Sequence, residues 1–288
     1  MVVTEDCPTV RLDLDSRPET LTLVRGALGG VGEFLAFDPE LLDDLKTAVS
    51  EACNNVVMHA YNGTPGPLGV LVYITAESVE VVVRDDGVGI PELAPEDDRM
   101  QGVGLPVIRA LARQAEFHKR PEGGTEVRML FEGRRAGKQL FQEPGDAAPD
   151  DGWVGRRFSG DAVVSLSPVT VVAGVLGRLA RALAARASFS LDRFSDVYLV
   201  TDAIAAHAAR AASGPRIGFG LSTETRRLEL TIGPFREGAS AQLRERPPAR
   251  SAGSALTLLS DELDIRQDDR GELLRVVMID ERRPRASV

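Results

Sequence analysis

The order of three short motifs, each on a different kind of predicted element, constrains this chain more than any other feature. Glu51-Ala-Cys-Asn-Asn55 lies in a helical segment, Asp85-Asp-Gly-Val-Gly-Ile90 closes an apolar run typical of a strand, and Gly102-Val-Gly-Leu105 opens another helix. A lone Gly-x-Gly occurs by chance in many soluble chains, so each motif alone is weak. Their order along helix, strand and helix favours one pocket built from an acid, an amide and closely packed glycines.

The segment around the first motif has the start and the apolar stripe of an amphipathic helix. Asp38 suits the N-cap, Pro39 the first helical position and Glu40 the positive end of the helix dipole. The stripe consists of Leu41, Leu45, Ala48, Val49, Ala52 and Val56. Glu51 and Asn55, four residues apart, lie on one flank beside it. A carboxylate there can accept a proton and an amide oxygen suits magnesium, although without the later motifs a solvated acid and amide would be the simpler interpretation.

The second motif follows a run of β-branched residues, Val79–Arg84, that predicts a strand buried on at least one face. Asp85 then comes at the strand end, where its carboxylate can accept a hydrogen bond from an exocyclic amine such as that of adenine. Gly87 and Gly89 lack side chains and let the backbone approach a flat ring closely. The competing interpretation is an ordinary Asp-Gly turn.

The third motif leads into an apolar helix, and backbone amides at such a helix start form a natural phosphate site. Here Gly102 and Gly104 are the candidates, and a plain glycine-rich loop is the alternative. Further on, Gly123 predicts a turn before a closing strand. Thr125, at the start of that strand, would hydrogen-bond near Asp85 if the two strands lie side by side.

Taken together, these motifs resemble the ATPase and kinase superfamily of gyrase, Hsp90, histidine kinases and MutL (GHKL). The segment Leu45–Tyr61 is most similar to the bacterial anti-sigma-factor serine/threonine kinases, and the similarity covers roughly residues 9–132. The resemblance implies an α/β fold, a two-layer α+β sandwich with helices over one face of a mixed, largely antiparallel sheet. It also implies Mg-ATP as ligand, and as partners a sigma factor and an anti-sigma-factor antagonist that is phosphorylated on serine or threonine.

The resemblance also implies a role for each matching residue. These roles are Glu51 as general base, Asn55 on magnesium, Asp85 on adenine, Gly87 and Gly89 under the base, Gly102 and Gly104 at the phosphates, and Thr125 near the adenine. Two features depart from the family pattern. The ATP lid between Gly89 and Gly102 is short and acidic, with Arg99 its single arginine, and Ala60 stands where many relatives have glycine.

The second half of the chain repeats the first at an apparently constant separation of 151 residues, which indicates an internal duplication. The matched pairs are Ser16 with Ser167, Glu51 with Asp202, and Gly102 with Gly253. At this separation Asn55 matches Ala206, Asp85 matches Pro234 and Gly104 matches Ala255, so the chemistry of the first half is lost. An unrelated α/β domain with chance spacing is the alternative.

We therefore expect tandem Bergerat-type ATP-binding domains: an ATP-binding, kinase-like domain at 1–132, a Gly/Pro-rich linker at 133–158, and a degenerate copy without nucleotide-binding residues at 159–288. Because kinases of this type commonly work as homodimers, the fused halves suggest an intramolecular pseudo-dimer.

Charge and cysteine content narrow the surroundings of the protein. Residues 1–132 contain 23 Asp/Glu against 11 Lys/Arg, an acidic balance that argues against direct nucleic-acid binding. Cys7 and Cys53 are too few for a disulfide framework and indicate reduced thiols. With no apolar run near the roughly 18 residues of a membrane helix and no signal peptide, we expect a cytoplasmic protein without membrane contact.

The sequence thus predicts an enzyme, a Mg-ATP-dependent protein serine/threonine kinase of the anti-sigma type. One alternative is a regulatory module in which ATP gates partner binding without phosphotransfer, and another is the ATPase domain of a histidine-kinase-like system. His59, one turn beyond Asn55, either faces the phosphates or is an ordinary surface histidine. Trp153 and the Tyr61 ring are interpreted as packing residues.

Overall fold

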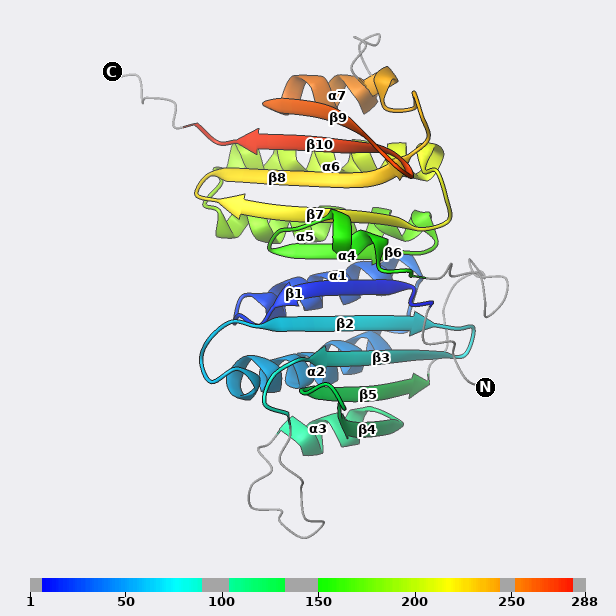
Figure 1. Ribbon diagram of the computed structural model, residues 1–288, viewed down its shortest axis with the longest axis vertical. Coiled ribbons are helices and arrows are strands. Elements are labelled where there is room, and N and C mark those ends of the chain that lie inside the picture. Colours follow the sequence, from blue (N-terminus) through cyan, green and yellow to red (C-terminus); the bar gives the residue numbers. More distant parts are fainter. Residues whose placement is uncertain (1–6, 90–103, 133–149, 244–251, 282–288) are drawn as a thin grey trace.

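The computed structural model describes residues 7–89, 104–132, 150–243 and 252–281. They form two main layers, one ten-stranded sheet with all but one short helix packed along one of its faces (Figure 1). The strand order is β4-β5-β3-β2-β1-β6-β7-β8-β10-β9, and every pairing is antiparallel. The predicted two-layer sandwich is confirmed, but the sheet is antiparallel in each pairing rather than mixed.

The first half supplies five strands and three α-helices to this sandwich. In chain order they are β1 (Val10–Asp15), α1 (Thr20–Phe34), α2 (Pro39–Asn55), the π-helical turn η1 (Val56–Ala60), β2 (Pro67–Ile74), β3 (Ser78–Asp85), α3 (Gly104–Leu111), β4 (Gln114–Lys119) and β5 (Thr125–Glu132). The predicted start of α2 is confirmed, since the Asp38 carboxylate accepts a hydrogen bond from the backbone N–H of Glu40 at 2.9 Å.

The second half repeats this order, with one extra helix in front. Its elements are α4 (Trp153–Arg157), β6 (Ala162–Leu166), the 3₁₀ turn η2 (Val169–Val171), α5 (Val172–Arg186), α6 (Leu191–Ala211), β7 (Ile217–Glu224), β8 (Arg227–Phe235), η3 (Ala241–Leu243), α7 (Ala252–Leu259), β9 (Glu262–Asp268) and β10 (Gly271–Ile279). Helix α4 lies on the sheet face opposite the other helices, where Trp153 and Phe158 are buried (Figure 1). Residues 150–158, assigned to the linker from sequence, are therefore part of the folded second half.

The two halves join in the middle of the sheet, where β1 pairs with β6 and Leu12 faces Val164. Read outward from this junction, both halves have the same strand order, β1-β2-β3-β5-β4 and β6-β7-β8-β10-β9. Above the junction α1 packs against α5. A single hydrophobic core runs beneath the helices of both halves.

The separation between matching positions is not constant, contrary to the sequence prediction. It is 152 at the helix caps Asp38 and Ser190, and 147 at Thr125 and Glu272, the first helix-facing positions of β5 and β10. One cause is the hairpin turn between the last two strands, which spans residues 120–124 in the first half and only 269–270 in the second. The matches drawn at a fixed separation of 151 are therefore displaced by one or more residues.

Candidate nucleotide site

The candidate site lies where the end of β3 meets the start of β5, under α2 and α3. Asp85 is the last residue of β3, and its side chain is only 4 % exposed. Its Oδ1 accepts a hydrogen bond from the backbone N–H of Gly87 at 2.8 Å. Thr125 donates further hydrogen bonds to this carboxylate, so the predicted approach of Thr125 to Asp85 is observed.

The burial of Asp85 has an electrostatic consequence. Removing the carboxylate from water raises its pKa, and the hydrogen bonds from Gly87 and Thr125 oppose that rise. A buried acceptor held by neutral donors, with no cationic side chain bonded to it among the described residues, can accept a hydrogen bond from a neutral amine and disfavours an anionic phosphate.

The glycines around Asp85 are needed for close packing of the protein's own backbone. A Cβ on Gly87 would lie 2.2 Å from the carbonyl oxygen of Ala60, and one on Gly124 would lie 2.0 Å from that of Asp85. Gly89 has a φ of +77°, in the left-handed region that favours glycine. The close packing against Ala60 therefore explains why position 87 is a glycine, a reason that the sequence did not indicate. The place of Gly87 under a nucleotide base stays a prediction.

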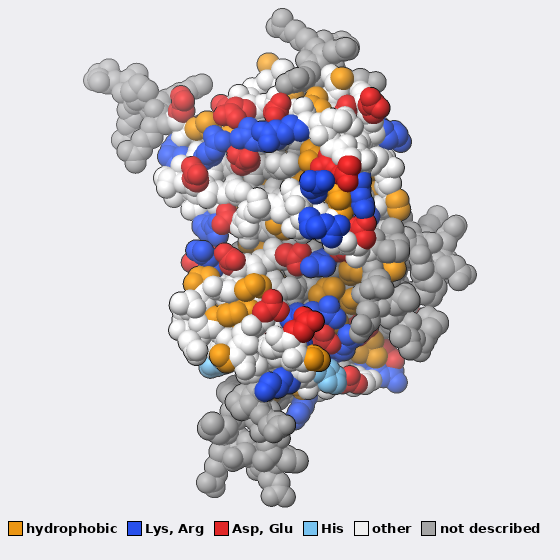
Figure 2. Space-filling view, viewed as in Figure 1, with side chains coloured by type: hydrophobic (Ala, Val, Ile, Leu, Met, Phe, Trp, Pro, Cys, Tyr) orange, Lys and Arg blue, Asp and Glu red, His pale blue; other side chains and the backbone are white. Residues whose placement is uncertain are grey.

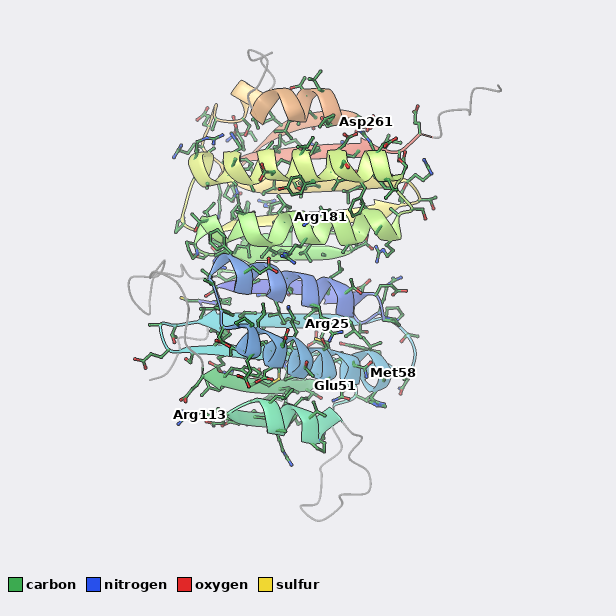
Figure 3. All side chains as sticks on the ribbon, turned by 180° about the vertical axis from the view of Figure 1, so that it is seen from behind. Arg25, Glu51, Met58, Arg113, Arg181 and Asp261 are labelled. Atoms are coloured by element: carbon green, nitrogen blue, oxygen red, sulfur yellow. The ribbon has the colours of Figure 1, made fainter. Side chains whose placement is uncertain are left out.

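Glu51 and Asn55 lie on α2 and are both half-buried. Figure 3 shows Glu51 on the flank of α2 that is turned toward α3, with Met58 farther along at the end of the same helical segment. The six apolar residues of the predicted stripe are all buried, so the acid and the amide flank the core as expected. After Asn55 the helix continues as the π-helical turn η1, a form common at functional sites.

Some of the predicted site residues lie outside the part of the chain that the structure describes. Gly104 begins α3, as predicted, whereas Gly102, Arg99 and the rest of the lid, residues 90–103, lie outside the described residues. His59 is exposed on η1. Cys53 is fully buried in α2, and burial raises the pKa of its thiol to about 12, which makes it an inert packing residue.

Two further residues contact the segment after Asp85, and sequence reasoning missed both. The Tyr61 hydroxyl accepts a hydrogen bond from the backbone N–H of Asp86 at 2.8 Å. Arg120 donates to the backbone carbonyl of Asp85 at 2.9 Å and also pairs with the Asp86 carboxylate. From the sequence Tyr61 is interpreted as a packing residue, and a lone arginine beside a turn carries no sequence signal.

The residues present fit the group that the family motif implies. The buried Asp85 carboxylate can accept the adenine amine, and the Asn55 amide can hold magnesium. The described residues contain no cluster of three or more His, Cys, Asp or Glu side chains that would hold a metal ion by themselves.

Comparison with known proteins agrees with this geometry. Residues 14–131 match the family described as the histidine kinase-like ATPase domain. This part of the chain is therefore similar to the ATPase domains of the GHKL superfamily, and its relatives agree with the resemblance to the anti-sigma-factor kinases.

Those relatives are serine-protein kinases named RsbW. The Bacillus pumilus protein is 35% identical over 86 residues, which cover 29% of this chain and 53% of the relative. The Bacillus velezensis protein is 37% identical over 79 residues, covering 27% of this chain and 49% of the relative. The chain thus spans about half the length of the curated relatives it matches. A crystal structure of the RsbU and RsbW domains of a Mycobacterium tuberculosis protein aligns at 22% identity with a TM-score of 0.34, covering 44% of this chain and 34% of that one.

Among the residues that the structure describes, no helix is long and apolar enough to cross a membrane.

Proposed function

We propose that this chain is a cytoplasmic, Mg-ATP-dependent protein serine/threonine kinase of the anti-sigma type. The observation that carries the proposal is the buried Asp85 carboxylate, hydrogen-bonded to Thr125, next to a helix that presents a half-buried acid and amide. The match of residues 14–131 to ATPase domains and the similarity to serine-protein kinases support it. Its partners would be a sigma factor, an anti-sigma-factor antagonist, or both.

Each residue has a defined task in the proposed reaction. Asp85 would hold the adenine amine, with Thr125 beside it, and Asn55 would hold magnesium, which neutralises charge on the phosphates. Glu51 would accept the proton of the antagonist's serine or threonine hydroxyl while that oxygen takes the γ-phosphoryl group and ADP leaves. Gly87 and Gly89 would lie under the base, and Gly102 and Gly104 at the phosphates.

We further propose that the second half is a copy that has lost its nucleotide site. At the observed matches Glu51 corresponds to Ala203, Asn55 to His207, and Asp85 to Phe235, the last helix-facing residue of β8. The His207 and Phe235 rings pack against each other with centroids 4.9 Å apart. Two rings in contact leave no room for a purine between these positions, which supports one nucleotide per chain.

Calorimetry and a phosphotransfer assay test this proposal. We expect one Mg-dependent ATP site per chain, weakened at least tenfold by Asn55→Ala, a loss typical of removing a ligand to a bound group. Glu51→Ala should abolish transfer of labelled γ-phosphate to protein while leaving ATP binding intact.

The matched control is Asp202→Ala, which removes an exposed acid from the corresponding helix α6 and should change neither result. Two ATP sites per chain would contradict the loss of the second site. Binding without any transfer would favour an ATP-gated regulatory module instead.

A further inference from the structure

The segment formed by Asp85 and Asp86 is held by two side chains from distant parts of the first half. Tyr61 comes from the end of η1, the continuation of the helix that carries Glu51 and Asn55. Arg120 comes from the hairpin turn between β4 and β5. Between them they bond to the backbone of Asp85 and to both the backbone and the side chain of Asp86.

The Tyr61 hydroxyl is a fixed junction between two backbone segments. It accepts from Asp86 N–H at 2.8 Å and donates to the Pro67 carbonyl at 2.5 Å. The phenol can do both only while protonated, and burial raises the pKa of Tyr61. Its ring rests on the backbone of Gly66, where an added Cβ would lie 2.3 Å from a ring carbon. The ring therefore has little freedom to move its hydroxyl.

Arg120 contacts the same segment from the hairpin turn between β4 and β5. One nitrogen, Nη1, bonds to the Asp85 carbonyl and to the Asp86 carboxylate. The turn that carries Arg120 is closed by hydrogen bonds from Arg120 N–H to the Gly124 carbonyl and from Gly123 N–H to the Arg120 carbonyl, and the Gly124 backbone packs directly on Asp85. The arginine thus ties the end of β3 to the hairpin that also supplies Thr125.

We propose that Tyr61 and Arg120 are positioning residues that fix the Asp85 carboxylate relative to helix α2 and thereby set the base specificity of the nucleotide site. The inference rests on the proposed function, because it requires Asp85 to bind the exocyclic amine of adenine. A carboxylate at the end of a strand selects that amine only if its direction is fixed, since a hydrogen bond weakens steeply when its distance and angle depart from the ideal. Neither positioning residue needs to touch the nucleotide.

The test compares ATP with purine riboside triphosphate, which lacks the exocyclic amine but is otherwise the same ligand. The wild-type chain should bind ATP about tenfold or more tightly than this analogue, the usual cost of leaving a buried acceptor unpaired. Tyr61→Phe should weaken ATP binding about tenfold and leave binding of the analogue nearly unchanged. The ratio of the two affinities should therefore fall toward one.

A second pair of variants separates positioning from simple loss of fold. Arg120→Lys keeps a cationic donor near Asp86, so it should lower the affinity ratio less than Arg120→Ala, which removes both contacts. The matched controls are Tyr198→Phe, an exposed tyrosine in the second half, and Arg113→Ala, which breaks the exposed ion pair with Glu132 elsewhere on the same β-hairpin. Both should leave the ratio unchanged.

The outcomes distinguish this inference from the function it rests on. A wild-type chain that fails to bind ATP, or binds both triphosphates equally, overturns the proposed role of Asp85 and the inference with it. A wild-type chain that prefers ATP, with Tyr61→Phe and Arg120→Ala variants that keep the same preference, overturns the inference alone. Variants that lose affinity for both triphosphates equally also overturn it, because a merely structural role predicts that result.

Discussion

His207 is a buried core residue at the position that matches Asn55 of the candidate nucleotide site. Its side chain is 6 % exposed, and its Nε2 has no hydrogen-bond partner among the described residues. Burial, reinforced by the positive charges of Arg210 and Arg236, lowers the pKa of the imidazole to about 4, although Glu272 opposes this. The folded protein therefore holds His207 neutral, while the unfolded chain protonates it near pH 6.5.

This difference in the pKa of His207 between the folded and the unfolded chain predicts that acid lowers the free energy of unfolding. As the pH falls, the unfolded chain takes up a proton on His207 at a higher pH than the folded protein does. The stability contributed by neutral His207 is therefore complete above pH 6.5 and is lost as the pH falls toward 4. At pH 5 the loss is about 2 kcal/mol. Urea unfolding at pH 7 and pH 5 measures this fall in the free energy of unfolding. The fall should be about 2 kcal/mol smaller in His207→Leu than in wild type, whereas the exposed His59→Leu variant should behave as wild type. Equal falls in all three proteins would contradict the assignment.

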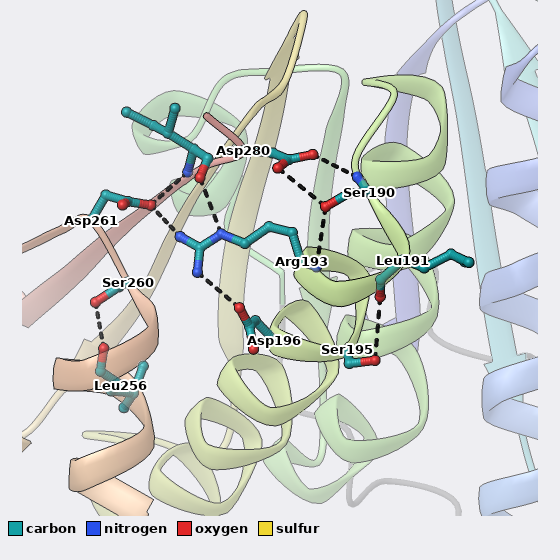
Figure 4. Close-up of polar contacts among 10 residues, drawn as sticks. Ser190, Leu191, Arg193, Ser195, Asp196, Leu256, Ser260, Asp261 and Asp280 are labelled. Carbon is teal, nitrogen blue, oxygen red and sulfur yellow. Dashed lines mark hydrogen bonds and ion pairs between the residues drawn. The ribbon is translucent and has the colours of Figure 1, made fainter. Parts of the chain in front are cut away.

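At the scale of elements, α6 shows how a helix start is fixed by distant strands. Ser190 caps the helix, and Asp280, just after β10, accepts hydrogen bonds from the Ser190 backbone and hydroxyl (Figure 4). One turn on, Arg193 bonds to the Ile279 carbonyl and pairs with Asp196 and Asp261 (Figure 4). The Asp38 cap of α2 is local, whereas the cap of α6 is completed by Asp280, which directly follows β10.

The crossing of α1 and α5 depends on two glycines that face each other. A Cβ on Gly30 would lie 2.0 Å from the Gly174 carbonyl oxygen. Gly30→Ala should therefore force the helices apart and lower the free energy of unfolding by about 1–3 kcal/mol, the usual cost of overpacking. Gly26→Ala is the control, since its Cβ would lie 3.9 Å from Leu179 and alanine favours helix by up to about 1 kcal/mol. Denaturant unfolding measures both, and a neutral Gly30→Ala would contradict the close crossing.

Charge patterns at the scale of the whole molecule separate the two faces of the sheet. The helix-covered face is apolar, while the opposite face carries acidic and basic side chains intermixed (Figure 2). Across β3 and β5, Arg84 pairs with Glu126, and across β8 and β10, Arg275 pairs with Glu229. The pairing with Glu229 and Glu262 raises the pKa of Arg275. Such cross-strand pairs keep this sheet face polar.

The continuous sheet predicts a chain that is monomeric in solution. The edge of β1 and the exposed flank of α1 are already covered by β6 and α5 of the same chain. The outer strands, β4 and β9, are short and polar, a pattern that discourages further strand pairing. Sedimentation should therefore give a mass of 30.9 kDa. A stable dimer formed through the first halves would contradict the intramolecular pseudo-dimer.

The sequence alone determined the elements whose stabilising contacts are local. Asp38 and Pro39 start α2, its apolar stripe is buried, and Val79–Arg84 lies within β3 as predicted. Caps, helical periodicity and β-branched runs act over a few residues, so they can be recognised in one chain. Part of the candidate nucleotide site could also be predicted from the sequence, because Asp85 ends a strand that local sequence signals identify.

Only the tertiary structure decided how those elements meet. The joining of β1 to β6, the drift of the repeat from 152 to 147, and the contact of His207 with Phe235 depend on the lengths of turns and on packing between segments far apart in sequence. The same holds for Tyr61 and Arg120, which reach the Asp85 segment across 25 and 35 residues of chain. Periodicity places a side chain on one face of its own element, but contacts between elements are made only when the whole core closes.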